Sequence, residues 1–140
     1  MRLAVVLGLI LLGLGWWAMR SSAPPPALIA GMSDEGLRGA PCPARSLQEQ
    51  DALRKRGPQS LSPFTAKLRA RFPLGAPEAT LRNELLSQGF ELTAPCPNDD
   101  SVLGARWRSS SWGEPDAYVY WRVDDHDNLS FLDGHISRAD

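Results

Sequence analysis

Histidine and cysteine are scarce in this chain of 140 residues, with two of each, and their scarcity limits the chemistry open to it. The sequence has no CxxC pair, no G-x-S-x-G motif and no glycine-rich phosphate loop. It therefore lacks the usual signatures of a zinc site, a hydrolase nucleophile and a nucleotide site. A formal net charge of −1 gives no basic footprint for nucleic acid. We expect a protein that is not an enzyme, with no cofactor and no nucleic-acid partner.

The N-terminus contains the long apolar run of the sequence. Residues 3–19 carry no ionisable side chain, and an arginine flanks the run at each end. As a helix rising about 1.5 Å per residue, the run would cover roughly 25 Å, which is short but sufficient for a membrane span. We expect residues 1–20 to be an uncleaved transmembrane anchor in the inner membrane, with the C-terminal domain in the periplasm. The alternative is a signal peptide cleaved near Ala23, although Pro24 disfavours that cut, and the protein would then be secreted or periplasmic.

Both cysteines lie in the same tetrapeptide, Ala-Pro-Cys-Pro, at Cys42 and Cys96. Prolines on either side favour extended backbone and exclude helix. Outside the cytoplasm, two such segments suit a disulfide, which chain-entropy reasoning values at about 4 kcal/mol for a loop of this size. A metal pair or a catalytic thiol is the alternative, but neither cysteine has a histidine close to it in the sequence.

Helix signals follow a Pro- and Gly-rich linker, expected at residues 21–44, and open a single α+β domain at residues 45–140. A capping box at Ser46 predicts a surface helix that ends at Arg56. Ser62-Pro63 predicts the start of a second helix, and residues 75–89 a third, so that the last two form a hairpin. The apolar spacing predicts a core-facing set on this hairpin. Its members are Phe64, Leu68, Phe72, Leu81, Leu85 and Leu86.

Strand-like alternation replaces the helical period after Phe90. Residues 102–108, 117–123 and 129–136 are the expected strands, and the polar stretches between them are turn-like. The predicted fold is therefore α+β, with an N-terminal transmembrane helix followed by a helical hairpin packed on a three-stranded antiparallel β-meander. One face of this sheet should cover the helices, and the other should face solvent.

The solvent-facing side of the expected sheet is the candidate binding site. It carries tyrosine and arginine, types that are enriched at binding hot spots. Its residues are Arg106, Arg108, Tyr118, Tyr120 and Arg122, together with Trp112 in the neighbouring loop. The alternative interpretation is that these side chains are cross-strand pairs that hold the sheet together.

An acidic turn with a histidine raises the question of a metal site. An EF-hand loop starting at Asp125 would need glycine at its sixth position, where the chain has Ser130. Polar turn residues explain the cluster without an ion, so we expect no bound metal. A metal-dependent hydrolase built on Asp124, His126 and His135 is the less favoured alternative.

One motif, residues 72–78, suggests a family. It is followed by Leu85, by Gly89-Phe90, and then by a Trp-bearing strand and residues 121–124. This order resembles the small periplasmic domains of the BamE type, the SmpA/OmlA family. The resemblance covers residues 62–136, and it implies an αα hairpin against a three-stranded antiparallel sheet that recognises a partner with its sheet face.

These expectations combine into one function. The chain should be a membrane-tethered, non-enzymatic binding or envelope-assembly module in the periplasm. Its partner would be an envelope protein or a cell-wall component, held by the exposed sheet face. An immunity or inhibitor protein is the alternative of a different class.

Overall fold

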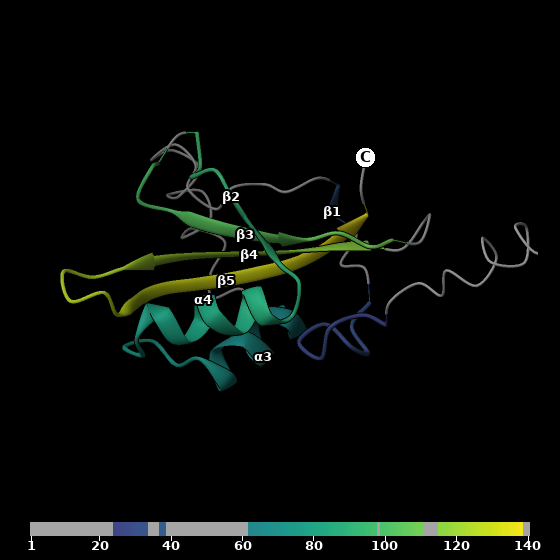
Figure 1. Cartoon of the computed structure of the whole chain (residues 1–140), viewed down its shortest axis with the longest axis horizontal. Coiled ribbons are helices and arrows are strands. Elements are labelled where there is room, and N and C mark those ends of the chain that lie inside the picture. The colour runs from purple at the N-terminus through teal and green to yellow at the C-terminus, as the bar shows by residue number, and fades with distance from the viewer. Residues whose placement is uncertain (1–23, 34–36, 39–61, 98, 111–114, 139–140) are drawn as a thin grey trace, which may run out of the picture.

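The computed structural model describes residues 24–33, 37–38, 62–97, 99–110 and 115–138. In this part of the chain, two helices lie against one face of a five-stranded sheet (Figure 1). The strand order is β1-β5-β4-β3-β2. Strands β2 to β5 are antiparallel, and β1 pairs in parallel with β5 at the sheet edge. The strands are β1 (Leu37–Arg38), β2 (Glu91–Thr93), β3 (Leu103–Trp107), β4 (Pro115–Val123) and β5 (Leu129–Arg138).

The predicted fold, a three-stranded meander behind a transmembrane helix, was wrong. The three expected strands exist as β3, β4 and β5, but β2 adds a fourth antiparallel strand. Strand β2 has three residues and β1 has two, so neither strand is long enough to show the alternation that identifies a strand in a sequence. Within the ranges that the structure describes, no helix is long and apolar enough to cross a membrane. The expected anchor, residues 1–20, and the expected helix at 46–56 lie outside those ranges.

Helix α3 (Pro63–Arg71) begins as predicted and packs closely on β5. The Ser62 hydroxyl accepts a hydrogen bond from the Thr65 N–H at 3.1 Å, and the stripe of Phe64 and Leu68 is fully buried. Gly134 in β5 permits this close packing. A Cβ atom there would lie 2.5 Å from Leu68 Cδ1 and 2.9 Å from the Phe64 ring. A side chain at this position would therefore push the helix away from the sheet.

Helix α4 (Glu78–Ser87) contributes the second apolar stripe. Leu81 and Leu85 are fully buried, as predicted, whereas Leu86 is 45% exposed. The expectation for Leu86 was wrong because successive helical residues are rotated by about 100°, which places it beside the core-facing stripe and not on it. The helix ends at Ser87, and Gly89, which follows the C-cap Gln88, has a φ of +83°.

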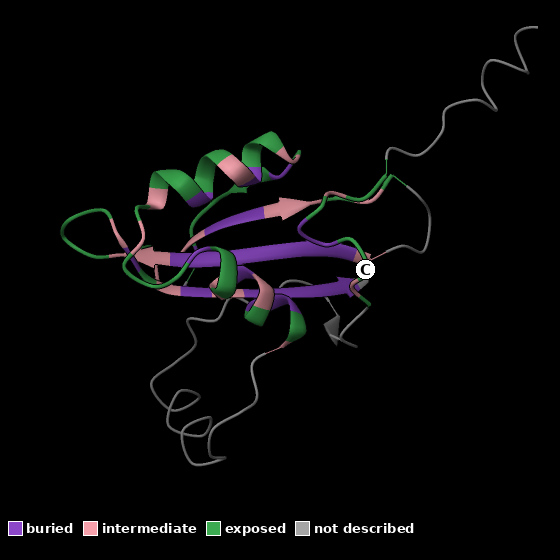
Figure 2. Ribbon diagram, turned by 90° about the horizontal axis from the view of Figure 1, so that it is seen from below, coloured by how far each residue is buried: buried purple, intermediate pink, exposed green. Residues whose placement is uncertain are grey.

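Two apolar clusters hold the described part of the chain together. The larger one lies between the helices and the sheet and includes Trp121, Val119 and Leu132. Leu28 and Ile29, from the expected linker, are also buried there. The smaller cluster lies on the opposite face of the sheet. Figure 2 shows buried residues concentrated in the central strands, while the outer faces of both helices are exposed. Both faces of the sheet are therefore packed.

Candidate functional site

The tyrosines of the expected binding face are buried, so the expectation that they face solvent was wrong. Tyr118 and Tyr120 are 5% and 6% exposed and belong to the smaller cluster with Cys96 and Val102. Both rings stack on His135, which lies opposite Tyr118 in β5, at centroid distances of 5.1 and 5.9 Å. Phe131 packs against the same cluster. These contacts stabilise the sheet and leave little of either ring available to a partner.

Two arginines of the predicted binding set, Arg106 and Arg122, form ion pairs within the chain. The Arg106 guanidinium donates to Asp116 through Nη2 and, at 3.0 Å, through Nε, and it also lies over the Tyr118 ring. Arg122 donates to Asp99 Oδ2 through Nη2 at 2.5 Å and lies over the Phe131 ring. A guanidinium held by a carboxylate inside its own chain has fewer donors for a ligand. The structure therefore favours the interpretation of Arg106 as part of a cross-strand pair with Asp116, whereas Arg122 joins β4 to the segment that precedes β3.

The remaining members of the predicted set are separated from this network. Arg108 follows β3 and is exposed, and Trp112 lies outside the described residues. The smaller cluster does contain Cys96, which is buried and disulfide-bonded. Cys42 lies outside the described residues, so its pairing with Cys96 stays a prediction.

The pKa values on this face follow from burial and hydrogen bonding. Burial raises the pKa of Tyr118, and it raises the pKa of Tyr120 to about 12. Hydrogen bonds from Ser101 and Arg122 lower the pKa of Asp99. At neutral pH the phenols are therefore protonated and the carboxylate is charged, which is the state in which the stacking and the ion pair are made.

The residues weighed for a metal site do not come together. Asp124 closes the turn between β4 and β5, where its Oδ1 accepts from the N–H groups of His126 at 2.8 Å and Asn128 at 3.0 Å. His135 lies six residues beyond the start of β5 at Leu129, which is roughly 20 Å along a strand. Across the described ranges, no group of three or more His, Cys, Asp or Glu side chains could hold a metal ion.

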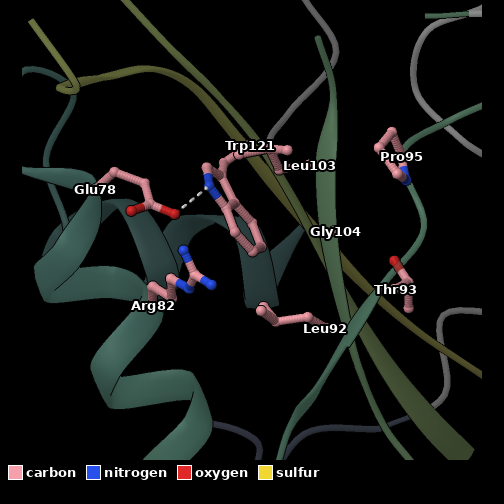
Figure 3. Close-up of a pocket in the computed structure, with 8 residues that line it drawn as sticks. All are labelled: Glu78, Arg82, Leu92, Thr93, Pro95, Leu103, Gly104 and Trp121. Carbon is pink, nitrogen blue, oxygen red and sulfur yellow. Dashed lines mark hydrogen bonds between the residues drawn. The ribbon is translucent and has the colours of Figure 1, made fainter. Parts of the chain in front are cut away.

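A pocket lies where the start of α4 faces the β2 edge of the sheet (Figure 3). We call it the edge pocket, and its cavity volume is about 120 Å³. Trp121 lies at its centre, and the indole Nε1–H donates to Glu78 Oε1 at 3.2 Å. This hydrogen bond satisfies the polar atom of a buried indole and fixes the ring. The lining residues are Glu78, Arg82, Leu92, Thr93, Pro95, Leu103, Gly104 and Trp121.

Arg82 and Leu92 are the residues of the edge pocket that a partner could contact. The Arg82 side chain points from α4 toward Trp121 and Glu78, and Leu92 extends from β2 toward the helix (Figure 3). Leu92 is 42% exposed, and all three residues of β2 are exposed. The pocket thus combines an apolar floor, a cation and a strand edge.

Sequence reasoning missed the edge pocket, although one signal for it was present. Glu78, Arg82 and Leu86 are spaced by four residues, so they lie on one stripe of α4, beside the buried stripe. A helix stripe that mixes polar and apolar side chains is typical of a partly covered surface. Strand β2, the other wall of the pocket, had no recognisable pattern.

No protein-family model, no curated protein and no solved structure matches this chain. The resemblance to the BamE type therefore stays a prediction, and the functional argument depends on the geometry of the chain itself.

Proposed function

We propose that this chain is a non-catalytic protein-binding domain of the cell envelope, and that it binds its partner at the edge pocket. The binding class was expected from the sequence. The site is moved from the central sheet face, where the tyrosines are buried, to the β2 edge.

The observation that carries the proposal is the exposure of β2 beside an apolar pocket. Strand β2 is the last strand of the sheet, and within the described part of the chain its one neighbour is β3. Proteins usually cover or charge such an edge, because its unpaired backbone groups can pair with another chain. Here an exposed leucine, Leu92, occupies the middle of the edge strand. This edge is short and also carries Glu91 and Thr93, so the exposed Leu92 beside the pocket is the feature that suits recognition of a partner.

Two observations support a location in the envelope. Residues 3–19 form an apolar run of the kind that directs export, whether it stays as an anchor in the inner membrane or is removed as a signal. Cys96 is disulfide-bonded, and disulfides persist mainly outside the cytoplasm. The partner we propose is therefore an envelope protein.

Site-specific photocrosslinking tests the proposed function in cells that express the full chain. Benzoylphenylalanine in place of Leu92 should give an adduct with a partner protein after irradiation, since the side chain lies at the pocket. The matched control carries the same group in place of Ala66, an exposed residue of α3. Helix α3 packs on β5, which is separated from β2 by two strands. The control should therefore give no such adduct.

The comparison has clear opposing results. Equal adducts from both positions would mean that binding is not centred on the edge pocket. No adduct from position 92 under conditions that label a known crosslinking pair would argue against a protein partner at this site. Either result would overturn the proposal.

A further inference from the structure

We propose that the edge pocket binds the C-terminal residue of an extended partner chain. This inference rests on the proposed function and adds the chemistry of the partner. The last side chain of the partner would be aliphatic and fill the pocket, its α-carboxylate would pair with Arg82, and its backbone would add to the sheet beside β2.

The first step concerns the backbone. Glu91, Leu92 and Thr93 pair with β3 on one side and are exposed. An extended peptide can add to such an edge, because the main-chain groups on the outer side lack a neighbouring strand among the described residues. A strand of three residues offers few hydrogen bonds, so pairing alone would be weak. The side chains must supply the rest of the affinity.

The second step concerns size. Pockets for cofactors and drug-sized ligands usually measure about 300–1,000 Å³. The edge pocket, at about 120 Å³, is well below this range and suits one side chain. Trp121, Leu103 and Leu92 provide an apolar lining, so that side chain should be aliphatic.

The third step concerns charge. Arg71, Arg106 and Arg122 each form an ion pair with a carboxylate. Arg82 differs from them, because no carboxylate of the described residues lies within ion-pair distance of its guanidinium. Its side chain instead points into the edge pocket toward Trp121 and Glu78, whose carboxylate accepts from the Trp121 indole (Figure 3). A guanidinium in this position is suited to a carboxylate, which it can hold with two parallel hydrogen bonds.

The last step combines size and charge. The aliphatic group and the carboxylate must both fit within one small pocket, because Arg82 and Leu92 line the same space. The final residue of a chain carries both groups on one Cα atom. Its chain also stops there, so no further residues have to leave a pocket that is large enough for one side chain. The geometry therefore favours a C-terminus over an internal acidic residue.

Peptides with matched ends test this inference on the full chain in detergent micelles. The probes are fluorescein-labelled hexapeptides that end in leucine or in lysine, each made as a free acid and as a C-terminal amide. By fluorescence anisotropy, the leucine free acid should bind about tenfold more tightly than its amide, since a charge-assisted hydrogen bond is lost on amidation. It should also bind more tightly than the lysine peptide, whose charged end does not suit the apolar lining.

Two variants test whether the difference in affinity between acid and amide arises at the edge pocket. Arg82→Gln should reduce the difference between acid and amide to less than about twofold, because the carboxylate loses its partner. Arg108→Gln, which removes an exposed cation away from the edge pocket, should leave the tenfold difference intact. Circular dichroism should show that both variants fold, because both arginines are exposed.

The opposing results distinguish a failure of C-terminal recognition from a failure of the proposed binding domain. Equal binding of acid and amide, no binding of any peptide, or a tenfold difference that survives Arg82→Gln would overturn C-terminal recognition. A Leu92 photo-adduct with a partner would in that case still support the binding domain. An adduct made only with a second copy of the chain would overturn both proposals.

Discussion

The two faces of the sheet are both packed, but by different chemistry. On the face under the helices, the buried side chains are almost entirely apolar, and they include Phe64, Leu68 and Trp121. On the opposite face, the packing adds to a small apolar cluster tyrosine rings stacked on His135 and arginines held by carboxylates. The first face is stabilised mainly by the removal of apolar surface from water, and the second by directional contacts.

This difference shows why an alternating strand need not have a solvent side. In β4, Val119 and Trp121 alternate with Tyr118 and Tyr120, and all four are at most 6% exposed. A polar atom on a side chain needs a hydrogen-bonding partner, and that partner can come from the protein as well as from water. We therefore place the proposed site at β2, where a strand edge is exposed, and not where polar side chains alternate.

Removing an aromatic ring from the face of the sheet that the helices cover should have the largest effect on stability. Phe64→Ala should lower the free energy of unfolding by about 3–5 kcal/mol, because a fully buried ring is replaced by a cavity between α3 and β5. Urea unfolding followed by tryptophan fluorescence measures this loss. Leu86→Ala is the matched control, since Leu86 is 45% exposed, and it should cost about 0.5 kcal/mol or less. Similar losses in the two variants would contradict the burial described for α3.

Removing one charge from the opposite face should have a smaller effect. Asp116→Asn should cost about 2 kcal/mol, because Asp116 is 3% exposed and accepts from Arg106 and from the Ser109 N–H at 3.1 Å. The same urea experiment applies, with Asp100→Asn as the control at an exposed position. If Asp116→Asn unfolds at the wild-type urea concentration, the Arg106–Asp116 ion pair contributes no stability, and the second face depends on its other contacts.

The elements that could be predicted from the sequence are those with strong local signals. Ser62-Pro63 marked the start of α3, Gly89 the end of α4, and the alternation of β3 and β4 was visible. These signals are local because capping, left-handed φ values and the pleat act within a few residues.

The remaining features depend on contacts between distant segments. Strand β2 forms because Leu92 pairs with Ala105, and its three residues carry no period of their own. The edge pocket requires Glu78 to meet Trp121, which follows it by 43 residues. The burial of Tyr118 depends on the partner that β5 places opposite it. None of these relations is encoded in spacing along the chain.

The smallest expected effect on stability is its pH dependence through Tyr120, on the face of the sheet opposite the helices. An ordinary tyrosine ionises near pH 10, whereas burial raises the pKa of Tyr120 to about 12. Between these values the unfolded chain loses the phenolic proton and the folded chain keeps it. The contribution of Tyr120 to stability is therefore complete below pH 10 and is lost progressively as the pH rises toward 12. At pH 11 the loss should be about 1.4 kcal/mol, which corresponds to one pKa unit.

A variant without the hydroxyl isolates this contribution. Tyr120→Phe keeps the ring that stacks on His135 and removes the proton, so its unfolding free energy should fall by about 1.4 kcal/mol less than that of the wild type between pH 9 and pH 11. Tyr118, whose pKa burial also raises, remains in both proteins and cancels in the comparison. Parallel pH curves for the two proteins would mean that Tyr120 is open to water in the folded state. The second face of the sheet would then be available to a partner after all, in competition with the β2 edge.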